Sequence, residues 1–396
     1  MSGKFTLYIP REVILGIDSF LELPQLVESL NVSKGSEVIL VIDPALEGVD
    51  RVAEGVNVLR RDFCLDVYKD VEYEPSVECA RRLAAHVREE KPDIVIGVGG
   101  GSTLDLAKIA AISIDDVERD VEDFLGFEKV SKRKLPLILI PTTAGTGSEV
   151  SKYVTLIKGS SKVDIVSKHV LPDIALVDPM LTLTMPPRLT AATGLDALSH
   201  AIEAFISTDA TPLTDVFSIQ STGLIFRYLR RAYYNGKDLE ARYFMSLAAT
   251  SAGVSLTAAR VVLGHSVSQT FGPRYGVHHG VACGMTLPYI MDFYLPALTE
   301  RFASLADVLA ICETSLGVRE RAERLVWETW ELVKDLDIPL SLREVGVSRA
   351  ELEDLAKSTL RDFPRPNSPI ELTKERVLKL YETMYEGSLR RVKIAS

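Results

Sequence analysis

The sequence has few cysteines and histidines, no excess of basic residues and no long apolar run. No stretch approaches the roughly 20 apolar residues that a membrane span needs, and the N-terminus lacks the apolar core of a signal peptide. A formal charge of −10 at pH 7 disfavours nucleic acid and anionic membranes as partners. We therefore expect a cytoplasmic protein. No Cys-x-x-Cys pair occurs, so we interpret the cysteines as reduced core thiols rather than disulfides or metal ligands: Cys64, Cys79, Cys283 and Cys312.

The first half of the chain alternates apolar runs with helical patterns. The runs at 37–43, 93–98, 135–141 and 173–179 are β-rich and continuous, as in strands that a parallel sheet buries on both faces. Between two of them, residues 76–90 carry apolar side chains at helical spacing. This alternation predicts an α/β domain with crossover helices.

The second half is different, because the β-rich runs end at the pair Pro186-Pro187. A chain of 396 residues exceeds what one hydrophobic core usually supports. We therefore predict an α/β domain over residues 1–185 and an all-helical domain over residues 186–396. The expected helices cover 189–207, 212–234, 239–262, 289–316 and two or three further segments.

One carboxylate and three imidazoles form a candidate metal site. Asp196 and His200 are four residues apart, so on a helix they share a face, and His265 and His279 lie close to glycines. Carboxylate and imidazole ligands without thiolate suit a catalytic Zn²⁺, Fe²⁺ or Mn²⁺ rather than a structural zinc site. The alternative is an incidental Asp-x-x-x-His with two unrelated loop histidines.

Two loops that follow buried strands are candidates for binding a dinucleotide. In the first, Gly99, Gly100 and Gly101 precede Ser102 and a helix, so backbone N–H groups can approach a pyrophosphate. Ser102 and Asp105 also fit a capping box that opens this helix. The second loop, PTTAGTGSEVS (141–151), offers the hydroxyl groups of Thr142, Thr143, Thr146 and Ser148, which are turn-capping residues in the alternative interpretation.

Asp43 ends the run at 37–43 and is a candidate for choosing between NAD and NADP. A carboxylate there can accept hydrogen bonds from ribose and would repel a 2′-phosphate, which favours NAD. The alternative is a turn aspartate before Pro44.

Five segments of the sequence, taken together in order, resemble the iron-containing, or group III, alcohol dehydrogenases: VGGGSTLDLAK, PTTAGTGSEVS, LPDIALVDP, GLDALSHAIEAF and GHSVSQTFGPRYGVHHGVACGMTLP. The resemblance implies NAD(P), a divalent metal that is Fe²⁺ or Zn²⁺, and hydride transfer between the nicotinamide and a metal-bound small alcohol or carbonyl. We expect an NAD-linked alcohol dehydrogenase or aldehyde reductase that forms a homodimer. The alternatives are a glycerol or glycerol-1-phosphate dehydrogenase, a lyase similar to dehydroquinate synthase, and a nucleotide-binding protein without catalysis.

The resemblance also implies roles for particular residues. It places the metal on Asp196, His200, His265 and His279, and the nucleotide on residues 99–102, Thr142, Thr143 and Lys162, with Asp105, Thr146 and Ser148 as further candidates. Many family members carry a histidine where this chain has Gln269, which cannot transfer a proton at neutral pH. His278 is therefore our candidate for proton transfer. Substrate-pocket candidates are Val150, Tyr153, Leu256, Arg260, Val261 and Phe271; for Arg260 the alternative is a surface or interface ion pair.

Overall fold

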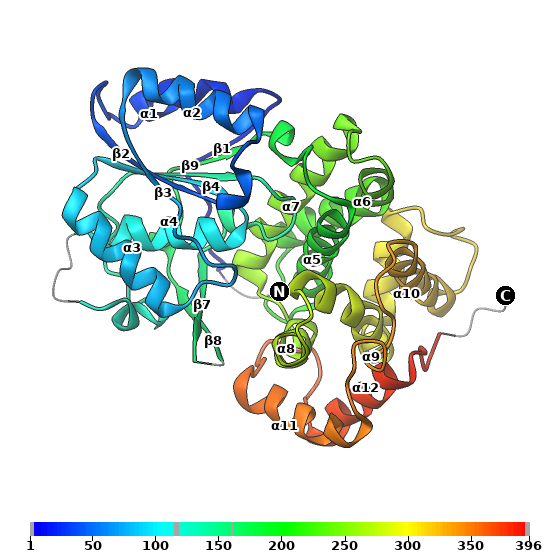
Figure 1. Ribbon diagram of the computed structural model, residues 1–396. Helices are drawn as coiled ribbons and strands as arrows, with labels where there is room; N and C mark the ends of the chain where they lie inside the picture. Colours follow the sequence, from blue (N-terminus) through cyan, green and yellow to red (C-terminus); the bar gives the residue numbers. More distant parts are fainter. Residues whose placement is uncertain (1–3, 115–118, 160, 393–396) are drawn as a thin grey trace. The chain divides into compact units, whose positions relative to one another are not determined.

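The computed structural model describes residues 4–114, 119–159 and 161–392 (Figure 1). The chain divides into two compact units, the first made of Met1–Met185 and Gly236–Thr257, the second of Pro186–Asn235 and Ala258–Ser396. The two predicted domains, residues 1–185 and 186–396, stay a prediction.

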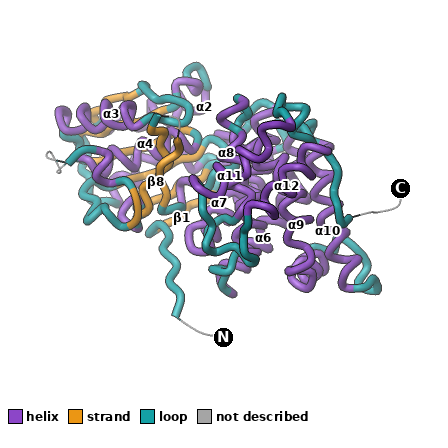
Figure 2. Tube along the Cα trace, turned by 90° about the horizontal axis from the view of Figure 1, so that it is seen from below, coloured by secondary structure: helices purple, strands orange, loops and turns teal. Residues whose placement is uncertain are grey.

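The first unit is built on a parallel sheet of six strands in the order β1-β9-β6-β4-β2-β3. The strands are β1 (Glu12–Leu15), β2 (Glu37–Ile42), β3 (Cys64–Tyr68), β4 (Ile94–Gly99), β6 (Leu137–Pro141) and β9 (Ile174–Val177). A smaller sheet holds β5 (Gly126–Phe127), β7 (Tyr153–Lys158) and β8 (Ser161–Val166). Figure 2 shows the strands in orange, and all of those in the described residues belong to this unit.

Helices cover both faces of the larger sheet. The helices of this unit are α1 (Leu23–Ser29), α2 (Asp50–Asp62), α3 (Val77–Glu90), α4 (Gly101–Ser113) and most of α7 (Leu239–Ala259). Helices α1 and α2 lie on one face of this sheet and α3 and α4 on the other (Figure 1). Val38 and Leu40 belong to the core shared with α1 and α2, whereas Ile39 and Val41 belong to the core shared with α3 and α4. Successive side chains of a strand point to opposite faces, so a strand buried on both sides must be apolar throughout.

The second unit is helical. Its helices are α5 (Pro187–Ile206), α6 (Pro212–Tyr234), α8 (Leu263–Phe271), α9 (His279–Val308), α10 (Val318–Asp335), α11 (Leu352–Asp362) and α12 (Lys374–Glu386). Every residue of α5 from Thr190 to Ile206 is buried, as expected of a helix at the centre of a bundle. The α/β sheet followed by a helical region confirms the predicted fold class.

Helix α9 differs from its prediction, since it begins at His279 rather than at Tyr289. Pro288 and Pro296 lie inside it, and the only break in its helical backbone is at Leu298. The sequence pattern was misleading because proline usually marks a helix end. By length and composition α9 could span a membrane, but 72% of its most apolar window is buried within the protein, as in the core helix of a globular domain.

Candidate metal centre and nucleotide-binding loops

The four predicted metal ligands lie together in the second unit. The Oδ1 atom of Asp196 lies 3.7 Å from Nε2 of His200, 3.7 Å from Nε2 of His265 and 3.6 Å from Nε2 of His279. Ligand atoms at about 2.0–2.2 Å from a tetrahedral metal lie about 3.3–3.6 Å apart. Helix α5 supplies the first two side chains from one face, α8 supplies His265, and His279 is the first residue of α9.

The electrostatics of the cluster also fit a cation. Oδ1 of Asp196 and Nε2 of His265 are buried and have no hydrogen-bond partner among the described residues. Burial alone would raise the pKa of Asp196, but the imidazoles of His200, His265 and His279 outweigh it and lower that pKa far below its usual range. An ionised carboxylate with an unsatisfied buried oxygen is costly unless a ligand binds it. The residues present therefore fit a divalent metal ion.

Glu203 orients one of these imidazoles, and the sequence analysis missed it. Its Oε1 lies 2.6 Å from Nδ1 of His265, while Oε2 accepts the backbone N–H groups of Val262 at 2.9 Å and His265 at 3.2 Å. A proton held on Nδ1 leaves the lone pair of Nε2 directed at the cluster. A Cβ on Gly264 would lie 2.6 Å from Oε1 of Glu203, so this approach requires glycine. The signal was available, because Glu203 is seven residues after Asp196 on the same helix face.

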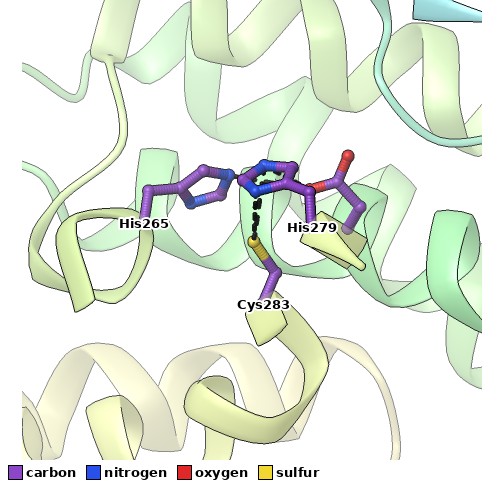
Figure 3. A group of neighbouring side chains, drawn as sticks. His265, His279 and Cys283 are labelled. Atoms are coloured by element: carbon purple, nitrogen blue, oxygen red, sulfur yellow. Dashed lines mark hydrogen bonds and ion pairs between the residues drawn. The ribbon is translucent and has the colours of Figure 1, made fainter. Parts of the chain in front are cut away.

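Cys283 is a second residue whose place the sequence did not reveal. It is buried, as is Cys79, and none of the four cysteines forms a disulfide, but the prediction of core thiols is wrong for Cys64, which is exposed, and for Cys312, which is half-buried. The Sγ atom of Cys283 lies 3.7 Å from Nε2 of His279, one helical turn earlier on α9 (Figure 3). Burial raises the pKa of the Cys283 thiol.

The two residues considered for proton transfer have other contacts in the structure. Nδ1 of His278 accepts the N–H of Gly280 at 3.2 Å and so caps the start of α9. The side-chain oxygen of Gln269 accepts a hydrogen bond from Arg365 at 3.2 Å. The relay role of His278 stays a prediction.

The two nucleotide-loop candidates adjoin in the first unit. Strands β4 and β6 are parallel neighbours, with Gly99 opposite Pro141, and the N–H of Thr142 donates to the carbonyl of Gly99 at 3.0 Å. A Cβ on Gly101 would lie 2.9 Å from Cγ2 of Thr146. The loops therefore meet at the carboxyl edge of the sheet, where open α/β sheets bind ligands.

The start of α4 fits an anionic ligand. Gly100 is the N-cap residue, and no side chain among the described residues caps this end. The N–H groups of a helix's first turn have no partner within the helix and attract phosphate. The backbone geometry thus fits a dinucleotide.

The predicted capping box is wrong. The hydroxyl oxygen of Ser102 accepts the N–H of Glu74 at 3.1 Å. Asp105 accepts the hydroxyl of Ser148 at 2.6 Å and the N–H of Thr155 at 2.9 Å. The side chains of Asp105 and Ser148 therefore bind each other across the two loops.

Lys108 completes this connection and was also missed. It is fully buried, and its ammonium group donates to the hydroxyl of Ser148 at 2.8 Å and to the carbonyl of Tyr153 at 2.7 Å. Burial lowers the pKa of Lys108. A lone lysine inside the apolar run LAKIAAI was the available signal. Lys108 thereby ties α4 to the second loop.

Asp43 and Lys162 have contacts of their own. Asp43 accepts the N–H of Ala45 at 2.9 Å, which is the turn geometry of the alternative interpretation. The ammonium group of Lys162, on β8, lies 2.7 Å from a carboxylate oxygen of Glu74. Their nucleotide roles stay predictions.

The substrate-pocket candidates are divided between the units. Val150, Tyr153 and Leu256 belong to the first unit, whereas Arg260, Val261 and Phe271 belong to the second. Arg260 donates to Asp209 at 2.6 Å, in agreement with the ion-pair alternative. Val150 and Phe271 are fully buried.

Comparison with known proteins agrees with this architecture. The family model described as "Iron-containing alcohol dehydrogenase" matches residues 10–179, and "Fe-containing alcohol dehydrogenase family, C-terminal" matches residues 190–385. The chain is 36% identical to long-chain-alcohol dehydrogenase 1 of Geobacillus thermodenitrificans (93% of this chain, 94% of the relative). It is 33% identical to the NAD-dependent methanol dehydrogenase of Bacillus methanolicus (91% and 95%). The crystal structure of a 1,3-propanediol oxidoreductase superposes with a TM-score of 0.92 at 31% identity (97% and 100%).

The fold, the candidate metal-binding cluster and these likenesses define an oxidoreductase of the alcohol dehydrogenase class. The chain belongs to the iron-containing alcohol dehydrogenase family. The resemblance stated from the sequence is therefore confirmed.

Proposed function

We propose that this protein oxidises small alcohols with NAD⁺ and reduces the matching aldehydes or ketones with NADH. The observation that carries the proposal is the buried cluster around Asp196, in which two polar atoms lack a hydrogen-bond partner among the described residues. Alcohols as substrates are supported by the relatives, and small alcohols by two of them, which are named for methanol and 1,3-propanediol, whereas a third is named for a long-chain alcohol.

The proposed ligands of Fe²⁺ or Zn²⁺ are Asp196, His200, His265 and His279. When bound, the ion would supply Lewis-acid chemistry by polarising the substrate oxygen and lowering the pKa of an alcohol. Imidazole and carboxylate donors suit both ions, so we propose that the site binds either Fe²⁺ or Zn²⁺.

The protein's own side chains prepare this site. Asp196 contributes a carboxylate at the centre of the cluster, where its Oδ1 lies 3.6–3.7 Å from the Nε2 atoms of the three imidazoles. Glu203 holds the proton of His265 on Nδ1 and keeps Nε2 available as a donor. Gln269 cannot transfer a proton at neutral pH. We therefore propose that the proton released from the alcohol passes to solvent, to ribose hydroxyls or to His278.

The proposed nucleotide site consists of residues 99–102 with Thr142, Thr143 and Thr146. Backbone N–H groups at the start of α4 would bind the pyrophosphate. We propose that Asp43 makes NAD the preferred cofactor, because a carboxylate repels the 2′-phosphate of NADP. A wild-type kcat/KM higher with NADPH than with NADH would contradict this role of Asp43.

We also propose that the protein is a cytoplasmic homodimer. Strand β1 lies at the edge of the larger sheet, and side chains on and beside it are apolar and exposed, namely Phe5, Ile9, Val13 and Ile17. An exposed apolar edge strand favours association with another chain. Light scattering coupled to size exclusion would show a mass of two chains.

The experiment that tests the activity is a substrate panel with the metal-loaded protein. Fe²⁺- and Zn²⁺-loaded samples are assayed with C2–C6 alcohols, diols, glycerol and aldehydes, each with NAD and NADP. We expect oxidation of primary alcohols with NAD⁺. Turnover of glycerol alone would favour the glycerol dehydrogenase alternative, and no turnover with any substrate would contradict the proposal.

A further inference from the structure

Cys283 gives the candidate metal centre one more donor atom than the proposed ligand set uses. One potential ligand atom from each of Asp196, His265, His279 and Cys283 lies within 4.8 Å of all the others. These four groups would suffice for a tetrahedral site, and His200 lies beside them with its ring stacked 4.7 Å from that of His265.

The position of the sulfur is fixed by α9. Cys283 is four residues after His279, so both side chains leave the same face of the helix, and Sγ approaches Nε2 of His279 to 3.7 Å (Figure 3). The residue is 2% exposed, so its side chain cannot turn into solvent without moving the helix.

A second observation points to a ligand at the same place. Oδ1 of Asp196 and Nε2 of His265 are buried, face the cluster and have no hydrogen-bond partner in the described part of the chain. The sulfur therefore adjoins two unsatisfied donor atoms and not merely apolar packing.

We infer that Cys283 selects the metal by acting as an additional ligand: a thiophilic ion such as Zn²⁺ takes the sulfur beside Asp196, His200, His265 and His279, whereas a harder ion such as Mn²⁺ leaves the sulfur unbound. The inference rests on the proposed metal centre. Thiolate is a soft ligand that favours Zn²⁺ over Mn²⁺, and imidazole is acceptable to both. On binding, the ion replaces the S–H proton, which passes to solvent, and one thiolate with one carboxylate balances the two positive charges.

The competing explanation is that Cys283 only fills space, as buried cysteines often do. Replacing it would then change the stability of the protein but not its preference among metals. The two explanations are separated by measuring metal preference directly, without an activity assay.

The first test uses Co²⁺ as a spectroscopic probe of sulfur ligation. The full-length protein is stripped of metal by chelation and titrated with Co²⁺. We expect a near-ultraviolet thiolate-to-cobalt charge-transfer band in the wild type that is absent from Cys283→Ser. The matched control is Cys79→Ser, since Cys79 is also buried but has its sulfur 3.5 Å from the carbonyl of Asp70 in the first unit. This control should retain the band.

The second test compares Zn²⁺ and Mn²⁺ by competition. We expect Cys283→Ser to reduce the ratio of Zn²⁺ to Mn²⁺ affinity on the order of tenfold or more, because it removes the soft donor. His200→Ala should change the ratio in the opposite direction, by weakening Mn²⁺ more than Zn²⁺.

Co²⁺ binding to the wild type without a charge-transfer band would overturn the inference and leave the proposed metal centre intact. An unchanged affinity ratio in Cys283→Ser would do the same. If the wild type bound none of these ions, both the inference and the proposed metal centre would be wrong.

Discussion

The two candidate sites of this protein are built from different parts of the chain. The nucleotide loops offer mainly backbone N–H groups at the start of α4, whereas the metal centre offers side chains from α5, α8 and α9. In the loops, Asp105, Lys108 and Ser148 bind one another. In the metal centre, Asp196 and His265 each keep a buried polar atom without a hydrogen-bond partner among the described residues. The side chains that connect α4 to the second loop therefore have partners, whereas the metal centre keeps two buried ligand atoms without one.

This difference implies different consequences of losing a ligand. Removing the metal should leave buried side-chain groups unsatisfied, whereas removing NAD leaves mainly backbone N–H groups, so we expect metal removal to lower stability more. The predictions below test the contrast, from the largest expected effect to the smallest.

The largest effect is expected from Asp196→Asn. The amide lacks the negative charge that faces three imidazoles, so bound metal and activity should both fall by more than about a hundredfold, beyond what residues that only support metal ligands usually cost. Elemental analysis of the purified variant and steady-state kinetics measure the two quantities. Full metal occupancy in this variant would remove Asp196 from the ligand set.

A smaller loss is expected from Glu203→Gln. The variant keeps the size of the side chain but loses the charge that holds the proton of His265, so metal affinity should fall by roughly 10–100-fold. The matched control is Glu149→Gln, another buried glutamate, which accepts the hydroxyl of Thr250 at 2.8 Å in the first unit.

The control should leave metal affinity unchanged. Burial raises the pKa of Glu149, so the glutamine resembles its protonated form. In the wild type, the pKa of Glu149 is higher in the folded state than in the unfolded state, so the free energy of unfolding should decrease as the pH rises from the unfolded-state pKa through the folded-state pKa. In Glu149→Gln this pH-dependent decrease should be absent. Equal metal affinities in the two variants would show that Glu203 has no special part in the site.

The nucleotide loops are tested by Gly100→Ala. A Cβ there would lie 3.6 Å from the nearest atom, Cγ2 of Thr143, and the backbone is extended, so the fold tolerates the methyl group. A pyrophosphate packed against the backbone would collide with the methyl group. NAD should therefore bind about tenfold more weakly, which is roughly 1.4 kcal/mol of binding free energy. Calorimetric titration measures this affinity, with Gly16→Ala as the control, since its new Cβ has an ordinary 3.5 Å contact. Unchanged NAD affinity in Gly100→Ala would contradict the backbone site.

The smallest effect is expected from Gln269→Ala. The substitution removes the hydrogen bond from Arg365, so stability should fall by about 0.5–1.5 kcal/mol. Turnover should change less than tenfold, whereas losing a positioned proton-transfer group costs roughly 10²–10⁴. A fall of more than a hundredfold with the metal retained would mean that the amide positions substrate or water.

The same contrast explains how much the sequence could predict. The parallel sheet and the helical second half were legible, because buried strands must be apolar throughout and long helices carry a strong periodic pattern. The candidate metal ligands could also be predicted from the sequence, since few residue types bind metal and a helix fixes the distance between residues four apart. They are Asp196, His200, His265 and His279. The structure brings these four together, while their binding of metal stays a prediction.

The contacts around the nucleotide loops could not be predicted from the sequence. The interaction of Asp105 with Ser148 joins residues 43 positions apart, and it depends on β4 and β6 being neighbours. The capping box was a local interpretation that tertiary contacts override. Cys283 was missed because the predicted helix began at Tyr289, so the spacing from His279 could not be applied to it. Glu203 lay within the predicted helix 189–207, but its contact with His265 joins two helices and depends on tertiary packing.

The most direct test of the central claim is a titration of activity with metal. Protein stripped by chelation is reloaded with Fe²⁺ or Zn²⁺ in steps, and bound metal is measured in each sample beside the rate of NADH formation from a primary alcohol. We predict no rate without metal and a rate proportional to bound metal up to one ion per chain. A metal-free protein as active as the reloaded one would contradict the account.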